Sequence, residues 1–168
     1  MSAVQALKLA RAAGVRIGID GDALTLTAEA APPADMLDLL SCHKAEVIAL
    51  LRTGSDGWSG EDWLALFDER AAIAEFDGSL PRQEAEVRAF DYCVVEWLNR
   101  NPARSPTGRC FGCGGSEHAH DKLLPFGTEP TGHAWLHSRC WPAWHAARKA
   151  EAIAALAAMG IVQPRMHR

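Results

Sequence analysis

The chain has 168 residues, of which 48% are hydrophobic and 23% charged, and its formal net charge at pH 7 is −4. These values fit one ordinary globular domain or two very small ones, and they exclude a protein whose overall charge drives nucleic-acid or membrane binding. The charge is uneven, however. Residues 58–102 hold ten Asp or Glu against four Lys or Arg, while residues 103–168 hold four against eight. This contrast between an acidic middle and a basic end predicts either separate modules or two faces that attract each other.

No segment approaches the roughly 20 apolar residues of a membrane span. Lys8 and Arg11 interrupt the apolar stretch at the N-terminus, which therefore does not look like a signal peptide. We expect a cytoplasmic protein, in which thiols stay reduced. Five cysteines in that compartment indicate metal ligands or free thiols in preference to disulfides.

Residues 1–53 predict a helix, a β-hairpin and then one or two helices. Apolar residues at helical spacing end at Gly14, which is typical of a helix stop. Residues 15–20 and 23–28 then alternate between apolar and polar side chains around an Asp-Gly-Asp turn, as the two strands of a hairpin do. Residues 31–52 show a second apolar helical face after a pair of prolines.

The stretch "LKLARAAGVRIGIDGDALTLTAEA", followed by "LLSCHKAEVIALLR", resembles the TubC-type N-terminal docking domain of hybrid peptide and polyketide synthetases. The resemblance covers about the first third of the chain. It implies a small, often dimeric αββαα domain that captures a short peptide segment of a partner chain through its exposed hairpin. The residues implied in partner binding are Arg16, Ile17, Ile19, Asp20, Asp22, Leu24 and Leu26.

Two features limit what this resemblance implies. About 115 residues follow, too few for the condensation or adenylation domain of such synthetases, so the resemblance implies a docking shape and not peptide synthesis. A two-stranded hairpin also has two free edges, and one of them can accept an added strand. Alternatively, the hairpin only covers the helices. Both readings of the hairpin stay open on sequence alone.

Residues 54–60 form an expected linker, and residues 61–102 an expected acidic helical hairpin. Ser59 and Asp62 have the spacing of a capping box, Pro81 suits the first turn of the second helix, and Pro102 ends it. We expect Cys42 and Cys93 to be buried packing residues. The carboxylates of this segment are expected on a solvated helix face and not in an enzyme site.

A cysteine and histidine motif stands out in residues 103–168. Cys110 and Cys113 form a CxxC followed by two glycines, and His137 and Cys140 repeat the spacing after 23 intervening residues. Two short strands are expected between the pairs, around "TEPT", and a helix with Pro142 in its first turn and Gly160 near its end is expected after them. This layout resembles a treble-clef zinc finger with a Cys₃His site.

Four histidines compete for the position of the fourth ligand. Any of His118, His120 and His133 could replace His137. His137 is preferred because its spacing to Cys140 places both at one helix turn. A structural Zn²⁺ fits best, since so short a segment gains folding energy from a metal. A catalytic Cys–His pair and a thioredoxin-like redox site fit the paired motifs less well.

The expected fold is therefore mainly α-helical with small β-hairpins, an α+β class. We expect a non-catalytic adaptor that binds a peptide or protein segment through its N-terminal domain and carries a structural zinc; a homodimer through that domain is open. One alternative is a nucleic-acid-binding zinc finger that uses the basic end and Trp135, Trp141 and Trp144. Another is a metal-dependent nuclease that uses His120 or His133.

Overall fold

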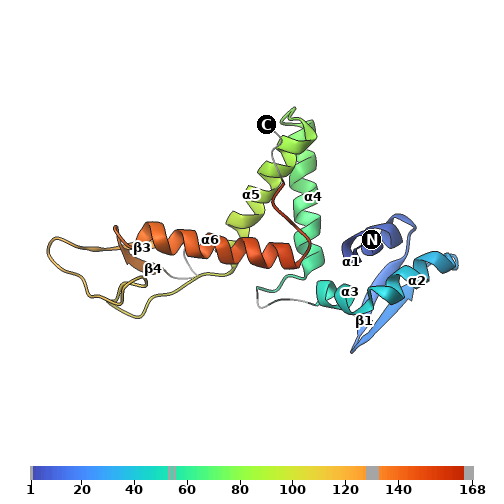
Figure 1. Cartoon of the computed structure of the whole chain (residues 1–168), viewed down its shortest axis with the longest axis horizontal. Coiled ribbons are helices and arrows are strands. Elements are labelled where there is room, and N and C mark those ends of the chain that lie inside the picture. The colour runs from blue at the N-terminus through green and yellow to red at the C-terminus, as the bar shows by residue number, and fades with distance from the viewer. Residues whose placement is uncertain (1, 53, 55, 128–132, 165–168) are drawn as a thin grey trace. The chain divides into compact units, whose positions relative to one another are not determined.

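The computed structural model describes residues 2–52, 54, 56–127 and 133–164. Helices dominate, and two antiparallel two-stranded sheets accompany them, which confirms the α+β class (Figure 1). The elements are α1 (Ala3–Ala12), β1 (Arg16–Asp20), β2 (Ala23–Thr27), α2 (Ala34–Cys42), α3 (Lys44–Leu51), α4 (Gly60–Phe76), α5 (Arg82–Arg100), β3 (Leu123–Phe126), β4 (Ala134–His137) and α6 (Trp141–Ala158).

The chain divides into two compact units, residues 1–65 and residues 66–168, and α4 begins in the first and continues in the second. The finer division expected from the sequence, at residues 53, 60 and 102, stays a prediction. Within the described residues, no helix combines the length and the apolar character that crossing a membrane requires.

The first unit has the expected order of helix, hairpin and two helices. A reciprocal capping box starts α1, because Ser2 Oγ accepts from the Gln5 N–H and Gln5 Oε1 accepts from the Ser2 N–H. Gly14 follows α1 with a φ of 75°, a left-handed conformation that glycine adopts without steric cost. The core of the first unit is built from buried apolar residues: Ala6, Leu7, Ala10, Val15, Leu40, Val47, Ile48 and Leu50.

The second unit contains most of α4, which lies antiparallel to α5 (Figure 1). Glu75 near the end of α4 pairs with Arg82 at the start of α5 at 3.0 Å, and Arg70 lies 4.1 Å over the ring of Tyr92. Cys93 is fully buried on α5, as expected. The expectation that Cys42 is buried is wrong: it is the last residue of α2, where the helix face turns to solvent, and it is exposed.

The C-terminal module of the second unit consists of β3, β4 and α6. Leu123 pairs with His137 and Phe126 with Ala134 across the hairpin. The expected "TEPT" turn at residues 128–131 lies outside the described residues. A small core of Cys110, Leu123, Ala134 and Leu136 lies beneath, with Phe126, Cys140, Trp141 and Trp144 packed against it. Three of the four are ordinary apolar residues and the fourth is an expected metal ligand, Cys110, so this core is thin.

Candidate metal centre

The first half of the site is a tight turn at Cys110 to Gly115. The Cys110 N–H donates to the Gly115 carbonyl, and the Gly114 N–H donates back to the Cys110 carbonyl, each at 2.8 Å. Gly114 has a φ of 72°, which the turn requires. The Phe111 N–H donates to the Trp135 carbonyl at 2.8 Å, and this bond joins the turn to β4. The CxxC pair is thereby placed directly beside the strand that carries His137.

The second half comes from the end of β4 and the start of α6. His137 is the last residue of β4, and Cys140 is the N-cap of α6. The Cys140 N–H donates to the His137 carbonyl at 2.8 Å and closes a turn between them. The expectation that both ligands share one helix turn is therefore wrong for His137. A strand end and a helix cap bring the two side chains together, because the chain reverses between them.

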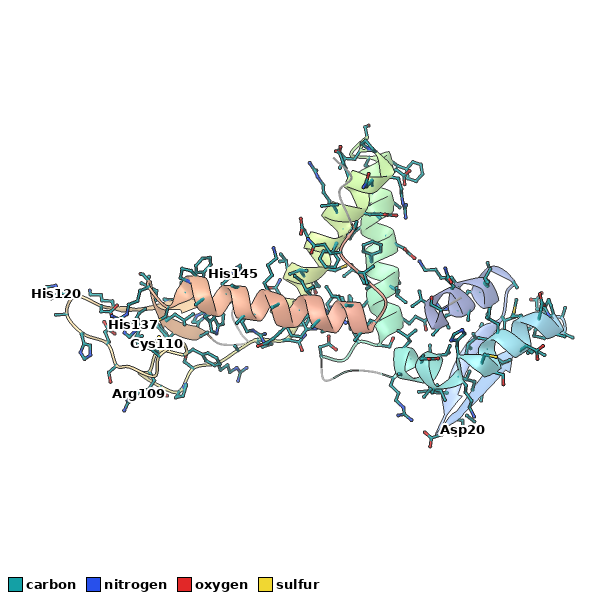
Figure 2. The ribbon with its side chains drawn as sticks, viewed as in Figure 1. Asp20, Arg109, Cys110, His120, His137 and His145 are labelled. Atoms are coloured by element: carbon teal, nitrogen blue, oxygen red, sulfur yellow. The ribbon has the colours of Figure 1, made fainter. Side chains whose placement is uncertain are left out.

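The four expected side chains lie together. One ligand atom from each of Cys110, Cys113, His137 and Cys140 lies within 4.8 Å of the other three (Figure 2 labels Cys110 and His137). Around a tetrahedral zinc with Zn–S bonds of about 2.3 Å, sulfur atoms are about 3.8 Å apart, so this spacing needs only a small contraction. The cluster could hold a metal ion, and its three sulfurs and one imidazole are the donors that zinc prefers.

The imidazole of His137 has a defined orientation. The ring is almost fully buried, at 1% exposure. Nδ1 lies 3.4 Å from Cys113 Sγ, while Nε2 lies 3.2 Å from the Ser116 carbonyl oxygen and 3.8 Å from an Asp121 carboxylate oxygen. Nδ1 is therefore the nitrogen that would bind a metal, and Nε2–H would donate to Ser116. An acceptor on the far nitrogen fixes the tautomer and the ring of a ligating histidine in this way.

Asp121 contributes a charge behind the ring. Its Oδ2 also lies 2.9 Å from Arg139 Nη2, so the carboxylate is held between Arg139 and His137. Burial lowers the pKa of His137, but contacts with Cys113, the Ser116 carbonyl and Asp121 raise it overall. The negative surroundings therefore favour a positive charge on or beside the ring, either a proton on the imidazole or a metal ion at Nδ1.

The thiols have unequal proton affinities. Burial raises the pKa of Cys110, but backbone N–H groups of His137, Cys113 and Gly112 directed at its sulfur bring the pKa down to about 6. The pKa of Cys113 is lowered by the Gly115 N–H and then by His137. Burial raises the pKa of Cys140 to about 11, and the two neighbouring sulfurs add to the rise. Three sulfurs crowd one space, and a divalent cation would relieve their repulsion.

One glycine, Gly112, makes room for this crowding. A Cβ on Gly112 would lie 2.9 Å from Cys140 Cβ, closer than side-chain atoms approach. A Cβ on Gly115 would lie 3.4 Å from Cys113 Sγ, which is ordinary contact. Gly112 was not expected to matter for the site, although its position inside the CxxC was an available signal. Ser116 and Asp121 were not expected either, because no local pattern relates them to His137.

The alternative histidines lie outside the cluster. His118 is exposed and its backbone pairs with Asp121, and His120 lies in the same exposed loop, at its outer end (Figure 2). The ring of His133 lies edge-on to Trp135, with centroids 6.0 Å apart. The geometry therefore favours His137 over these three as the fourth ligand.

The hairpin residues expected to bind a partner separate onto two faces. Ile17 pairs with Leu26 and Ile19 with Leu24, so these four side chains share one face of the β1–β2 sheet. Arg16 and Asp20 belong to the opposite face. Asp22 lies in the turn, accepts from Arg52 at 2.7 Å and is thereby partly neutralised. Figure 2 shows Asp20 at the tip of the hairpin.

Comparison of the chain with protein-family models, with curated proteins and with solved structures finds no match in any of the three.

Proposed function

We propose that the Cys₃His cluster holds one structural Zn²⁺ and that the chain is a non-catalytic adaptor which binds a peptide or protein segment through the β1–β2 hairpin. The observation that carries this proposal is the convergence of four ligand atoms within 4.8 Å. Four protein ligands fill a tetrahedral shell and leave no position for a reacting water, as in structural zinc sites. The thin core of the C-terminal module gives such a metal a role in folding.

The hairpin supports the adaptor half of the proposal. In the described part of the chain, β1 and β2 pair only with each other, so each strand has an edge without a strand neighbour. Ile19 and Leu26 are each 38% exposed on the apolar face. An extended peptide with alternating apolar side chains matches an edge of this kind. The resemblance of residues 1–53 to docking domains points to the same role.

Bound metal per chain, measured by elemental mass spectrometry, tests the first half. We expect one zinc in the wild type, loss of zinc in Cys113→Ser and Cys140→Ser, and loss of C-terminal structure with it. The Cys42→Ser variant is the matched control, because Cys42 lies outside the cluster and is exposed. A folded wild type without metal contradicts the proposal.

A peptide-display selection against the full chain tests the second half. Peptides selected on the wild type should bind Ile19→Lys and Leu26→Lys at least tenfold more weakly, because each change places a charge on the apolar face. Leu37→Lys on α2 is the matched control, since Leu37 is also exposed, at 40%, but lies outside the hairpin. Peptides that bind all three variants equally well contradict docking at the hairpin.

A further inference from the structure

Three large apolar side chains are exposed on one face of the α4–α5 helix pair. Ile73 on α4 is 41% exposed, and Tyr92 and Val95 on α5 are 40% and 57% exposed. All three line a groove of about 560 Å³ to which both helices contribute. Ala74 and Ala89 also line the groove, and their small side chains let another helix approach closely. Apolar side chains gathered on an exposed face are typical of a surface that meets another protein.

The groove also contains charged side chains of both signs without an ionic partner. Arg70 lies over the ring of Tyr92, 4.1 Å from its centroid, and forms no hydrogen bond or ion pair with a described residue. The same holds for Arg88 and Asp91, which are exposed on α5. By contrast, Arg82 at the start of α5 is paired with two glutamates. The groove therefore leaves charges available to an incoming surface that carries both signs.

Arg88 and Asp91 have the arrangement that a two-fold symmetric contact needs. They lie three residues apart on α5, so they belong to one side of the helix about one turn apart. When a second α5 packs antiparallel about an axis midway between them, Arg88 of each copy faces Asp91 of the other. Two equivalent ion pairs then form across the contact. The axis passes beside Ala89, where the groove is least obstructed by side chains.

The size of the face suits a weak dimer. With 17 and 19 residues, α4 and α5 are about 25 and 28 Å long, and side by side they present a face about 20 Å wide. Two such faces in contact bury on the order of 1,000 Å², the lower limit for a specific interface. Residues 58–102 hold ten acidic side chains against four basic ones, and the resulting repulsion between copies weakens the contact further.

We propose that this groove is a contact between two copies of the chain, in which antiparallel α5 helices form reciprocal Arg88–Asp91 ion pairs and bury Val95. The inference is independent of zinc binding and of peptide docking, because the groove belongs to the second unit and the hairpin to the first. A dimer would carry two β1–β2 hairpins and so bind repeated docking segments with higher avidity, a consequence that rests on the proposed function.

Sedimentation equilibrium of the full chain, from about 1 µM to about 500 µM, tests the contact, since an interface of this size should dissociate in the micromolar range. Arg88→Glu and Asp91→Lys should each raise the dimer Kd at least tenfold, because each change opposes like charges twice across the two-fold axis. The double variant Arg88→Glu/Asp91→Lys exchanges the two charges and should return the Kd to near the wild-type value.

Matched controls separate the contact from general effects of charge and exposure. Lys149→Glu on α6 changes the net charge as Arg88→Glu does, but Lys149 lies outside the groove, so its Kd should stay unchanged. Val95→Lys should prevent association. Val162→Lys should not, because Val162 is similarly exposed, at 63%, and does not line the groove. Circular dichroism of each variant checks that its helices are retained.

Three outcomes would overturn the proposal. A wild type that stays monomeric at the highest concentration leaves the groove to a different partner. A dimer that survives Val95→Lys, or that both single charge variants leave intact, forms elsewhere; loss of that dimer in Leu26→Lys would place it at the hairpin. A dimer lost in both single charge variants and not regained in the double variant lacks the reciprocal ion pairs.

Discussion

Nδ1 of His137 lies 3.4 Å from Sγ of Cys113, and this contact joins the end of β4 to the tight turn at Cys110 to Gly115, which we call the knuckle. The opposite nitrogen, Nε2, faces the Ser116 carbonyl at 3.2 Å. The ring is thus oriented before any metal binds, and Nδ1 is the nitrogen available to it. The site behaves as a preformed receptor in which each ligand has a definable contribution.

Replacing His137 should distinguish a ligand from a packing residue. His137→Ala should lose zinc, because three sulfurs leave the shell incomplete, whereas His137→Cys should keep it with a fourth sulfur. The absorption of Co²⁺-loaded protein measures the outcome, since each thiolate ligand adds to the cobalt–sulfur charge-transfer band. His118→Ala is the control and should leave the spectrum unchanged; cobalt binding that survives His137→Ala with the wild-type spectrum would contradict the assignment.

Metal affinity should fall as pH falls. Ligation needs thiolates and a neutral imidazole, and the Cys140 thiol, with its pKa raised to about 11, must release a proton when metal binds at neutral pH. Affinity should therefore drop about tenfold per pH unit for each proton released. Below pH 6 the drop should steepen, because the pKa of Cys110 is about 6 and its thiolate then also takes up a proton. Competition with a chromophoric chelator across the pH range measures this, and a flat profile would contradict it.

Gly112→Ala should weaken the site through sterics alone. The new Cβ would lie 2.9 Å from Cys140 Cβ, so the knuckle and the start of α6 must move apart. We expect a loss of about 1–3 kcal/mol in the free energy of unfolding of the metal-bound protein, together with weaker metal binding. Gly115→Ala is the matched control, since its nearest neighbour, Cys113 Sγ, would lie 3.4 Å away. Equal effects of the two changes in chemical denaturation would count against the close approach.

Thiol labelling should proceed in three steps. In the zinc-loaded protein only Cys42 should react rapidly, because it is exposed and lies outside the cluster. A chelator should release Cys110, Cys113 and Cys140. Cys93 should react only on unfolding, since it is fully buried and burial raises its pKa to about 11. Mass spectrometry counts the labels, and rapid labelling of Cys113 without a chelator would contradict metal protection.

Ser59→Ala should destabilise the start of α4. Ser59 Oγ donates to an Asp62 carboxylate oxygen at 2.6 Å and accepts from the Asp62 N–H at 3.2 Å, and the change removes both bonds. The bond from the Ser59 backbone N–H to the Asp62 carboxylate, at 2.8 Å, remains. The expected loss in the free energy of unfolding is about 1 kcal/mol. Ser41→Ala, at an exposed position inside α2, is the control and should be neutral. Thermal and denaturant unfolding measure both.

Local sequence patterns were sufficient to predict the helices and hairpins, because contacts between residues a few positions apart determine them. Glycine stops, alternation around Asp-Gly-Asp, the Ser59–Asp62 box and Pro142 at the start of α6 predicted the helices and hairpins that the structure contains. The same spacing rules selected the four side chains that lie together, because each CxxC-like pair is brought together by its own turn. The exposure of Cys42 could not be read in this way, since it depends on which helix face finds a neighbour.

The sequence by itself thus determined the elements and the three cysteines of the site, and its spacing rule favoured His137 without excluding His118, His120 and His133. Only the tertiary structure decided which histidine completes the set, because the β3–β4 register and the turn into α6 bring His137, and not His133, to the knuckle. It also decided which nitrogen of His137 faces the sulfurs and that Gly112 lies too close to Cys140 for a side chain. A cavity lined by Phe126, Trp141 and Trp144 likewise depends on tertiary structure. These features join segments far apart in the chain, and packing, which has no local signature, fixes their geometry.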